Sequence, residues 1–230
     1  MALPKLETPT YELTLPSTGQ KIKYRPFLVK EYKVLLTALD SDSSEIQRTV
    51  TELVDVCTFN KLNADSLPNF DIEYLFLNIR AKSIGEVSTI LMKCEKCETE
   101  MTVDMDITKT EILKDPTHNS KIQITDDITI EMRYPKFSEI MEIYLNLNTD
   151  KIVDLIGQCI KTVYTVDSKY DDFTKEELNE FINSFSRAQF EKLEQFFLTM
   201  PKVAQTIEKD CPNCSHHNVT TVEGLQNFFA

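Results

Sequence analysis

The chain has 230 residues, of which 41% are hydrophobic and 27% are charged, proportions that are ordinary for a globular protein with a substantial core. No apolar run approaches the roughly 20 residues that a membrane-spanning helix needs, and the first residues lack the pattern of a secretory signal. The net charge of -12 makes the average surface repel phosphate and anionic lipid, so we expect a cytosolic protein that binds neither nucleic acid nor membrane.

The low glycine count excludes several common enzyme signatures. Four glycines leave no G-x-G-x-x-G, no G-x-x-x-x-G-K-[ST] and no G-x-S-x-G motif in the sequence. These motifs form phosphate-binding loops and the turn that carries the nucleophilic serine of many hydrolases. We therefore predict a protein without enzymatic activity and without a small-molecule substrate.

The first 90 residues predict a β-hairpin followed by three helices. Residues 11–15 and 21–24 alternate around a Pro-Ser-Thr-Gly turn, which is typical of a hairpin. Apolar residues then recur at helical spacing in three segments, and the second carries Cys57 on its inward face. The predicted helices cover residues 27–39, the stretch after the capping cluster at 41–44, and residues 69–84, with Gly85 as the C-terminal stop.

The middle of the chain favours strands. Residues 86–93 are β-branched and apolar, Cys94 and Cys97 follow, and residues 100–107 alternate again, which predicts two strands joined by a cysteine-bearing turn. Residues 121–134 predict a further hairpin, after which Pro135 marks a change of pattern.

Residues 137–199 are predicted to form a helical block. Thr174 with Glu177 reads as a capping box, Ser186 as a helix cap, and Met200-Pro201 as the end of the block. Short strands at 202–209 and 218–224 then flank a second cysteine pair. The apolar stripes of the block are Phe137, Ile140, Met141 and Tyr144; Ile152, Leu155, Ile156, Cys159, Ile160 and Val163; Leu178, Phe181, Ile182 and Phe185; and Phe190, Leu193 and Phe197.

Together these elements predict an α+β fold with an N-terminal β-hairpin plus helices, a split zinc-ribbon-like β element, and an inserted helical block. Apart from the two cysteine turns, the sequence shows no internal repeat. We expect the two cysteine-bearing segments to pack together. The predicted domains are 1–90, the hairpin and helices; 91–134, the first cysteine turn and its hairpins; 135–200, the helical block; and 201–230, the second cysteine turn and C-terminal tail.

Two C-x-x-C pairs, Cys94 with Cys97 and Cys211 with Cys214, are the strongest chemical signal. Tetrahedral zinc takes four thiolates, and a tight turn between strands aims two of them at one point. We predict one structural zinc site, because a complete shell leaves no position for water. The spacer is long, but loop-closure entropy grows only logarithmically with length, so an inserted segment can separate the pairs.

Three other interpretations of the cysteine pairs stay open. Disulfides are disfavoured in a cytosol, and a thioredoxin-like role needs its pair at the start of a helix, whereas Cys97 is followed by a strand pattern. The thiols can also be unbound and structural. His216 and His217 are potential substitute ligands, although four cysteines already complete the shell.

The remaining cysteines and the third histidine favour structural roles. Cys57 and Cys159 are predicted to pack inside helical faces as small hydrophobic residues. His118 is predicted to be a surface residue, since no nucleophile or carboxylate pair can be placed beside it. Two aspartate pairs are predicted to be turn and cap residues: Asp126 with Asp127, and Asp171 with Asp172.

Both ends of the chain offer possible contact surfaces. The first 36 residues are basic relative to the rest, which could steer them onto an acidic partner, although a run of charge is usually a solvated face. At the other end, Phe228 and Phe229 either form a second contact or fold back on the core. The basic segment contains Lys5, Lys21, Lys23, Arg25, Lys30 and Lys33 against Glu7, Glu12 and Glu31.

The segments LPKLETPTYELTLPSTGQKIKYRPFLVKEYKVLL and LPNFDIEYLFLNIRAKSIGEV resemble the baseplate hub proteins of T-even-like contractile-tailed bacteriophages, which are described as hub subunits or hub assembly proteins. The resemblance covers most of the chain and is strongest in the first 90 residues. It implies a non-enzymatic role in building the baseplate that nucleates the tail tube and sheath, inside an infected bacterium. No catalytic residue is implied.

We therefore predict a structural or assembly protein of the virion tail baseplate, assembled in the host bacterial cytoplasm, whose partners are other hub and tail proteins. Two alternatives are a zinc-ribbon nucleic-acid-binding protein and a transient assembly chaperone that is absent from the virion. A thiol oxidoreductase is a third. Against nucleic-acid binding, the lysines beside the first pair, Lys93 and Lys96, are outnumbered by Glu95, Glu98 and Glu100.

Overall fold

The computed structural model describes residues 6–41, 43–140 and 149–225, and it confirms the predicted mixed α+β class. The described residues form two compact units, one within Met1–Leu113 and Lys202–Ala230 and the other within Lys114–Pro201. Among the described residues, none of the helices has the length and apolar character needed to span a membrane. Five residues that the sequence analysis singles out lie outside the described residues: Lys5, Met141, Tyr144, Phe228 and Phe229.

The first unit begins with the predicted hairpin, β1 (Tyr11–Thr14) paired antiparallel with β2 (Lys21–Tyr24). Leu13 and Ile22 lie opposite each other and are buried, so the alternation of the sequence places one face of the hairpin in the core. Gly19 adopts a φ of 72° in the turn, a conformation that costs glycine little. The turn is attached to a helix because the backbone N–H of Ser17 donates to Asp71 at 3.0 Å.

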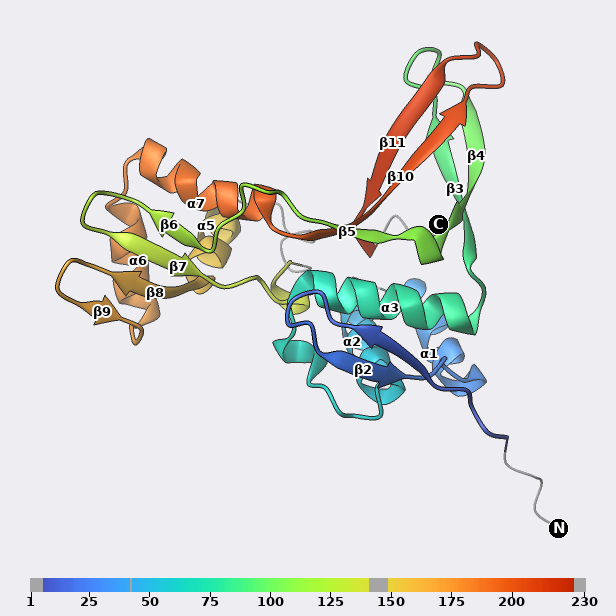
Figure 1. Ribbon diagram of the computed structural model, residues 1–230, viewed down its shortest axis with the longest axis horizontal. Coiled ribbons are helices and arrows are strands. Elements are labelled where there is room, and N and C mark those ends of the chain that lie inside the picture. The colour runs from blue at the N-terminus through green and yellow to red at the C-terminus, as the bar shows by residue number, and fades with distance from the viewer. Residues whose placement is uncertain (1–5, 42, 141–148, 226–230) are drawn as a thin grey trace. The chain divides into compact units, whose positions relative to one another are not determined.

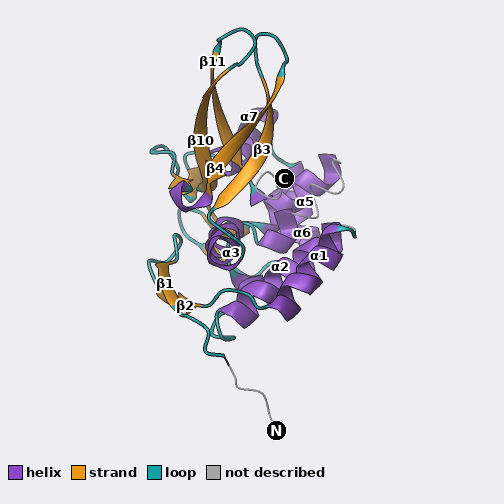
Figure 2. Ribbon diagram, turned by 90° about the vertical axis from the view of Figure 1, so that its right-hand side faces the viewer, coloured by secondary structure: helices purple, strands orange, loops and turns teal. Residues whose placement is uncertain are grey.

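Three helices follow, α1 (Val29–Leu39), α2 (Ser43–Cys57) and α3 (Asn69–Ser83). Figures 1 and 2 show α3 lying between the β1–β2 hairpin on one side and α1 and α2 on the other. This position explains why α3 is buried over most of its length, with the charged residues Asp71 and Glu73 buried among its apolar ones. Its fully buried residues include Ile72, Leu75, Phe76, Leu77 and Ile79.

Two long hairpins complete the first unit. One joins β3 (Val87–Lys93) to β4 (Glu100–Asp106), and the other joins β10 (Lys202–Asp210) to β11 (His217–Glu223). Figure 1 shows the two hairpins extending side by side with their cysteine turns at the same end. A short strand that the sequence analysis did not predict, β5 (Glu111–Leu113), pairs with β10 and makes a sheet of order β11-β10-β5.

The second unit contains a four-stranded antiparallel sheet of order β6-β7-β8-β9 and three described helices. The strands are β6 (Lys121–Gln123), β7 (Thr129–Met132), β8 (Ile160–Tyr164) and β9 (Lys169–Tyr170). The helices are α5 (Thr149–Gln158), α6 (Lys175–Asn183) and α7 (Arg187–Thr199), and residues 137–140 are also helical. Sheet and helices share one core, in which Ile130 and Val163 cluster with Ile156, Ile182 and Leu193.

The prediction that residues 137–199 form a helical block is wrong at 160–170, which contains β8 and β9. Ile160 and Val163 fit the stripe of α5 in sequence, but they belong to β8, which pairs with β7. The stretch from Ile160 to Tyr164 is rich in β-branched residues, which favour strands. A short apolar run fits both a helix and a buried strand, and the hydrogen bonds to β7 make this one a strand. The predicted caps are confirmed, with Thr174 and Glu177 forming a capping box and Ser186 capping α7.

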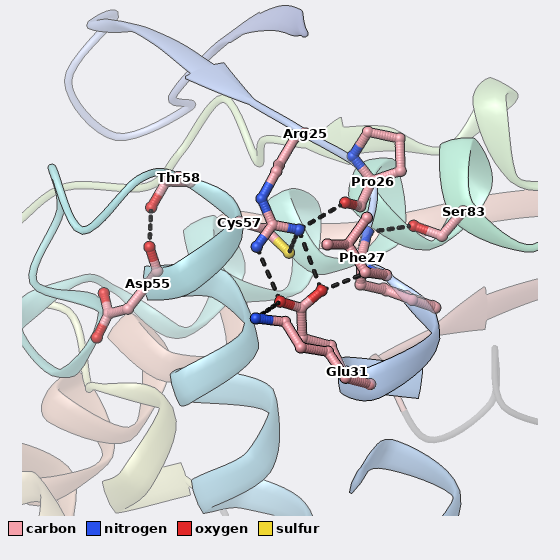
Figure 3. Close-up of polar contacts among 10 residues, drawn as sticks. Arg25, Pro26, Phe27, Glu31, Asp55, Cys57, Thr58 and Ser83 are labelled. Atoms are coloured by element: carbon pink, nitrogen blue, oxygen red, sulfur yellow. Dashed lines mark hydrogen bonds and ion pairs between the residues drawn. The ribbon is translucent and has the colours of Figure 1, made fainter. Parts of the chain in front are cut away.

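A buried ion pair fixes the passage from the β1–β2 hairpin to α1 (Figure 3). The guanidinium of Arg25 donates to both carboxylate oxygens of Glu31, at 3.1 and 2.9 Å, and to the carbonyl of Pro26 at 2.9 Å. Glu31 also accepts the backbone N–H of Leu28, and the backbone N–H of Arg25 donates to the carbonyl of Cys57 at 3.0 Å. This set of bonds, called the clasp below, ties the hairpin, α1 and the end of α2 together.

The second unit contains the same clasp, built by residues in the same order. Arg133 donates to both oxygens of Glu139, at 2.9 and 2.7 Å, and to the carbonyl of Tyr134 at 3.1 Å. Glu139 accepts the backbone N–H of Lys136, and the N–H of Arg133 donates to the carbonyl of Cys159 at 2.7 Å. The chain therefore has an internal structural repeat, which corrects the inference that only the cysteine turns recur.

The order of elements extends the repeat beyond the clasp. In each copy a hairpin is followed by an arginine–glutamate clasp. A helix, α2 or α5, then ends at or just before a buried cysteine, Cys57 or Cys159, and a long helix, α3 or α7, follows later. Each long helix is followed by a strand, a C-x-x-C turn and a returning strand. The copies differ mainly between the buried cysteine and the long helix, where residues 58–68 in one correspond to 160–186 in the other.

Two cations lie near Glu31, and we expect removal of Arg25 to lower the free energy of unfolding much more than removal of Lys30 does. The Arg25 and Glu31 side chains are 13% and 10% exposed, whereas Lys30, 3.7 Å from the same carboxylate, is 75% exposed. Arg25→Met removes the buried partner of the Glu31 carboxylate and leaves only the exposed Lys30 near it, so this variant is expected to lower the free energy of unfolding by about 3–5 kcal/mol. Lys30→Met is the matched control and is expected to change it by less than about 1 kcal/mol.

Urea denaturation of the two variants measures this difference. The double variant Arg25→Met/Glu31→Leu should recover part of the loss, because it removes both charges from the buried site. Equal losses from Arg25→Met and Lys30→Met would show that the clasp is no stronger than an exposed ion pair.

Buried Glu73 on α3 gives the first unit a specific dependence on pH. Burial raises the pKa of Glu73 to about 7, against about 4.3 for a glutamate in an unfolded chain, and its carboxylate accepts the N–H of Leu225 at 3.3 Å. The folded state therefore binds this proton more tightly. The resulting stabilisation is complete below the unfolded pKa and is lost as the pH rises through about 7.

Glu73→Gln, which keeps the shape and cannot ionise, is expected to raise the melting temperature by several °C at pH 8 and to have little effect at pH 4.5. Thermal unfolding across this pH range measures the difference, with the exposed Glu111→Gln as a control without pH dependence. A shift of the same size at both pH values would contradict a charged Glu73 at pH 8.

Candidate metal centre

The two cysteine turns have the same backbone geometry. In the first, the N–H of Cys94 donates to the carbonyl of Thr99 at 3.0 Å, and the N–H of Glu98 donates to Cys94 at 2.9 Å. In the second, Cys211 donates to His216 at 2.8 Å and Ser215 donates to Cys211 at 2.9 Å. The residue after each second cysteine adopts a positive φ, 56° for Glu98 and 54° for Ser215. Each turn thus presents its two thiols from a tightly closed loop.

The structure brings all four sulfur atoms together. The Sγ atoms of Cys94 and Cys214 are 3.7 Å apart, those of Cys97 and Cys211 are 3.5 Å apart, and all four lie within 4.8 Å of one another. Zinc bound at about 2.3 Å in a regular tetrahedron places its sulfur ligands about 3.8 Å apart. The donor set and the spacing therefore fit a four-thiolate metal site.

Polar side chains join the two turns to each other. The buried Asn218 accepts the N–H of Glu95 at 3.0 Å and donates to the carbonyls of Lys209 and His216 at 3.2 and 3.0 Å. Asn213 donates to Thr99 at 3.2 Å, beside the Cys97 sulfur. These bonds hold the loops in register independently of the thiols.

The sulfur atoms differ in how readily they lose a proton. The hydroxyl and backbone N–H of Thr99 hydrogen-bond to Cys97 and lower its pKa to about 6. Cys214 is favoured as a thiolate by the N–H of His216, but the three neighbouring sulfurs outweigh this effect and raise its pKa to about 12. Four adjacent thiolates repel one another, so full deprotonation of the cluster requires a cation among them.

The histidines do not join the cluster of metal-ligating atoms. His217 lies 2.7 Å from Asp210 and 3.7 Å from Glu208, and the hydrogen bond to Asp210 raises its pKa. His118, predicted to lie on the surface, is instead partly buried in the second unit. It hydrogen-bonds to Thr199 at 3.0 Å and to Tyr134 at 3.2 Å, and burial lowers its pKa.

The other two cysteines are buried at the two clasps, as the sequence predicted. Cys57 and Cys159 have no exposed surface, and burial raises their pKa values to about 11 and about 12. Both are therefore protonated near neutral pH and are poor nucleophiles. Their carbonyls, which accept the clasp arginines' N–H groups, matter more to the fold than their thiols.

The structure separates the alternatives for the C-x-x-C pairs. All six cysteines are free, and the Sγ separations of 3.5 Å for Cys97–Cys211 and 3.7 Å for Cys94–Cys214 exceed the roughly 2.05 Å of a disulfide bond. Both pairs sit in hairpin turns, not at the start of a helix as in thioredoxin-like redox sites. A metal site and unbound thiols are the two interpretations compatible with this geometry.

The sequence motifs indicate the four cysteines but not the residues that position them. Thr99, Asn213 and Asn218 bond to a sulfur atom or across the two turns. Their proximity to the cysteines was the available signal, since all three lie within four residues of a C-x-x-C member. Which polar residues near a turn point toward the partner turn depends on how the hairpins pack, and the sequence does not contain that information locally.

Comparisons with known proteins agree with the resemblance seen in the sequence. A profile of the family "T4 bacteriophage base plate protein" matches residues 8–230. The chain is also 28% identical over 222 residues to the "Baseplate hub assembly protein gp26" of Enterobacteria phage T4, covering 95% of this chain and 97% of that protein. No solved structure shows a significant match to the chain.

Proposed function

We propose that this chain, which belongs to the T4 bacteriophage base plate protein family, is a structural and assembly protein of the phage baseplate hub. The near end-to-end match to a baseplate hub assembly protein carries this proposal, because it spans both compact units and both cysteine turns. The protein acts through contacts with other hub and tail proteins. It is assembled in the host bacterial cytoplasm and retained in the virion tail baseplate.

A surface for such contacts is present on the first unit. Helix α1 and the residue before it expose several apolar side chains, more than the fold requires on a solvated helix face. Leu28, Val29, Val34, Leu36 and Leu39 are 39%, 71%, 51%, 44% and 36% exposed. The basic N-terminal segment contributes less charge than its composition indicates, because Arg25 is committed to Glu31 and Lys23 lies 3.5 Å from Glu12.

The cysteine cluster, in this proposal, holds one structural zinc ion in a zinc-ribbon-like site. Cys94, Cys97, Cys211 and Cys214 supply four thiolates, and this closed shell leaves no coordination position for a substrate or an activated water. The site joins two hairpins within one unit. A non-enzymatic role is also supported by the buried, protonated state of Cys57 and Cys159.

A nucleic-acid-binding function receives less support. Near the cysteine turns, Lys93 lies 3.5 Å from Glu100, and His217 is paired with Asp210. Positive groups that are already paired, in a chain of net charge -12, provide little attraction for a phosphate backbone. A gel shift at low salt that weakens steeply as salt is added would restore this alternative.

Loss of one cluster cysteine should remove zinc and stability together. Structural zinc binds zinc-finger peptides with about 10–16 kcal/mol of apparent free energy, so Cys94→Ser and Cys211→Ser are expected to lower both zinc content and melting temperature substantially. Elemental analysis and calorimetry of anaerobically purified protein measure both quantities. Cys57→Ala is the control: it should lower the melting temperature by creating a cavity and leave the zinc content unchanged. Unchanged melting of Cys94→Ser would contradict a structural zinc site.

A phage with a stop codon in this gene tests the assembly role. Electron microscopy of infected cells is expected to show few or no complete baseplates, and expression of the intact chain should restore them. Mass spectrometry of purified particles and of assembly intermediates separates a retained subunit from a transient chaperone. Normal baseplates without the chain, or its absence from both particles and intermediates, would refute the proposal.

A further inference from the structure

The segment 160–186 contains structure that the repeated scaffold does not require. The first copy of the repeat connects its buried cysteine, Cys57, to its long helix through residues 58–68, which form a turn and one short 3₁₀ helix. The second copy uses β8, β9 and α6 for the same connection. Since the clasp, the long helix and the cysteine turn form in both copies, the additional elements serve a purpose other than completing this scaffold.

These additional elements line an apolar cavity that is open to solvent. Its volume is about 340 Å³, near the lower end of the ~300–1,000 Å³ that is usual for ligand sites. All of its lining residues except Ile128 belong to 160–186. They are Ile128, Val163, Thr165, Tyr170, Asp172, Phe173, Glu177, Leu178 and Phe181.

The charges around the cavity select its occupant. The lysines of this segment are already in ion pairs: Lys161 with Glu131 at 2.7 Å, Lys169 with Asp171 at 2.6 Å, and Lys175 with Asp154 at 3.4 Å. No lysine or arginine is among the residues that line the cavity, so its lining has no cation for a phosphate or a carboxylate ligand. Two of the lining residues, Asp172 and Glu177, are acidic and exposed, and they form the rim of the cavity. The segment thus offers an apolar cavity with an acidic rim.

We propose that this cavity is a docking site for a partner protein, and that it receives one large apolar side chain flanked by lysine or arginine residues of the partner chain. The aromatic and aliphatic lining buries the apolar side chain, while the acidic rim attracts the flanking cations and fixes the direction of the bound segment. The inference deepens the proposed function and rests on it, because it names the chemistry of one hub or tail partner.

The test uses the full chain and three peptides. The probe is acetyl-Gly-Lys-Lys-Phe-Lys-Lys-Gly-amide, and the comparison peptides replace phenylalanine by alanine or all lysines by glutamate. In an NMR titration the probe should cause saturable shifts confined to Ile128 and residues 163–181. The alanine and glutamate peptides should bind at least tenfold more weakly. Shifts spread over the acidic surface, or equal binding of the alanine peptide, would overturn the site.

Two variants locate the binding on the protein. Tyr170→Ala removes a lining side chain that is 53% exposed, and Asp172→Lys reverses an exposed rim charge, so neither disturbs the core. Each variant should lower the affinity for the probe peptide at least tenfold and keep the wild-type melting temperature. Leu198→Ala, on an exposed side chain of α7, and Glu111→Lys, in the other unit, are the controls and should bind the probe normally.

Complementation separates this inference from the proposed function. In phage that lack the chain, Tyr170→Ala and Asp172→Lys should restore baseplates at least tenfold less well than Leu198→Ala and Glu111→Lys. If all four variants restore assembly equally, the docking site is wrong and the hub assembly role stands. If phage that lack the chain already build normal baseplates, the hub assembly role itself fails, whatever the peptides do.

Discussion

Four thiols that converge from two hairpins set the layout of the first unit. Cys97 and Cys211 are separated by 114 residues in sequence, yet their sulfur atoms are 3.5 Å apart. The chain must therefore leave the first unit after β5, build the second unit, and return as β10 and β11. Because β10 also pairs with β5, the return is fixed by backbone hydrogen bonds as well as by the cysteine turns.

The repeat gives a physical reason for the wide spacing of the two cysteine pairs. Each pair ends one copy of the same series of elements, so the residues between them are largely the second copy and not an unrelated insertion. The guanidinium–carboxylate pair occurs in both copies because each copy passes from a hairpin into a helix at this point. A chain leaving a hairpin must turn into a helix and still satisfy its buried N–H groups, and Arg25 with Glu31, like Arg133 with Glu139, does both.

The two copies have diverged where the scaffold permits it. Replacing the short 58–68 connection by β8, β9 and α6 leaves the clasp intact, because β8 adds to the free side of β7 and extends an existing sheet. The addition produces a cavity and an acidic rim in one copy. The thiols at the two clasps, Cys57 and Cys159, are buried and protonated near neutral pH, which makes them poor nucleophiles.

The sequence by itself determined the elements whose signals are local. These include the α+β class, the β1–β2 hairpin, the caps at Thr174 and Ser186, the inward faces of Cys57 and Cys159, and the family, since periodicity, capping chemistry and sequence motifs act over a few residues. It also identified the four cysteines, because the C-x-x-C spacing is itself a short-range pattern.

Only the tertiary structure decided what depends on partners distant in the chain. Ile160 and Val163 continue the apolar stripe of a helix in sequence, but they form a strand because they pair with β7. His118 is partly buried because it packs against Tyr134, Phe196 and Thr199, and Asn218 bridges the cysteine turns because the hairpins face each other. The Arg–Glu clasp crosses a junction between a strand and a helix, where neither the strand nor the helix period applies, so its two copies became recognisable as a repeat only through matching hydrogen bonds.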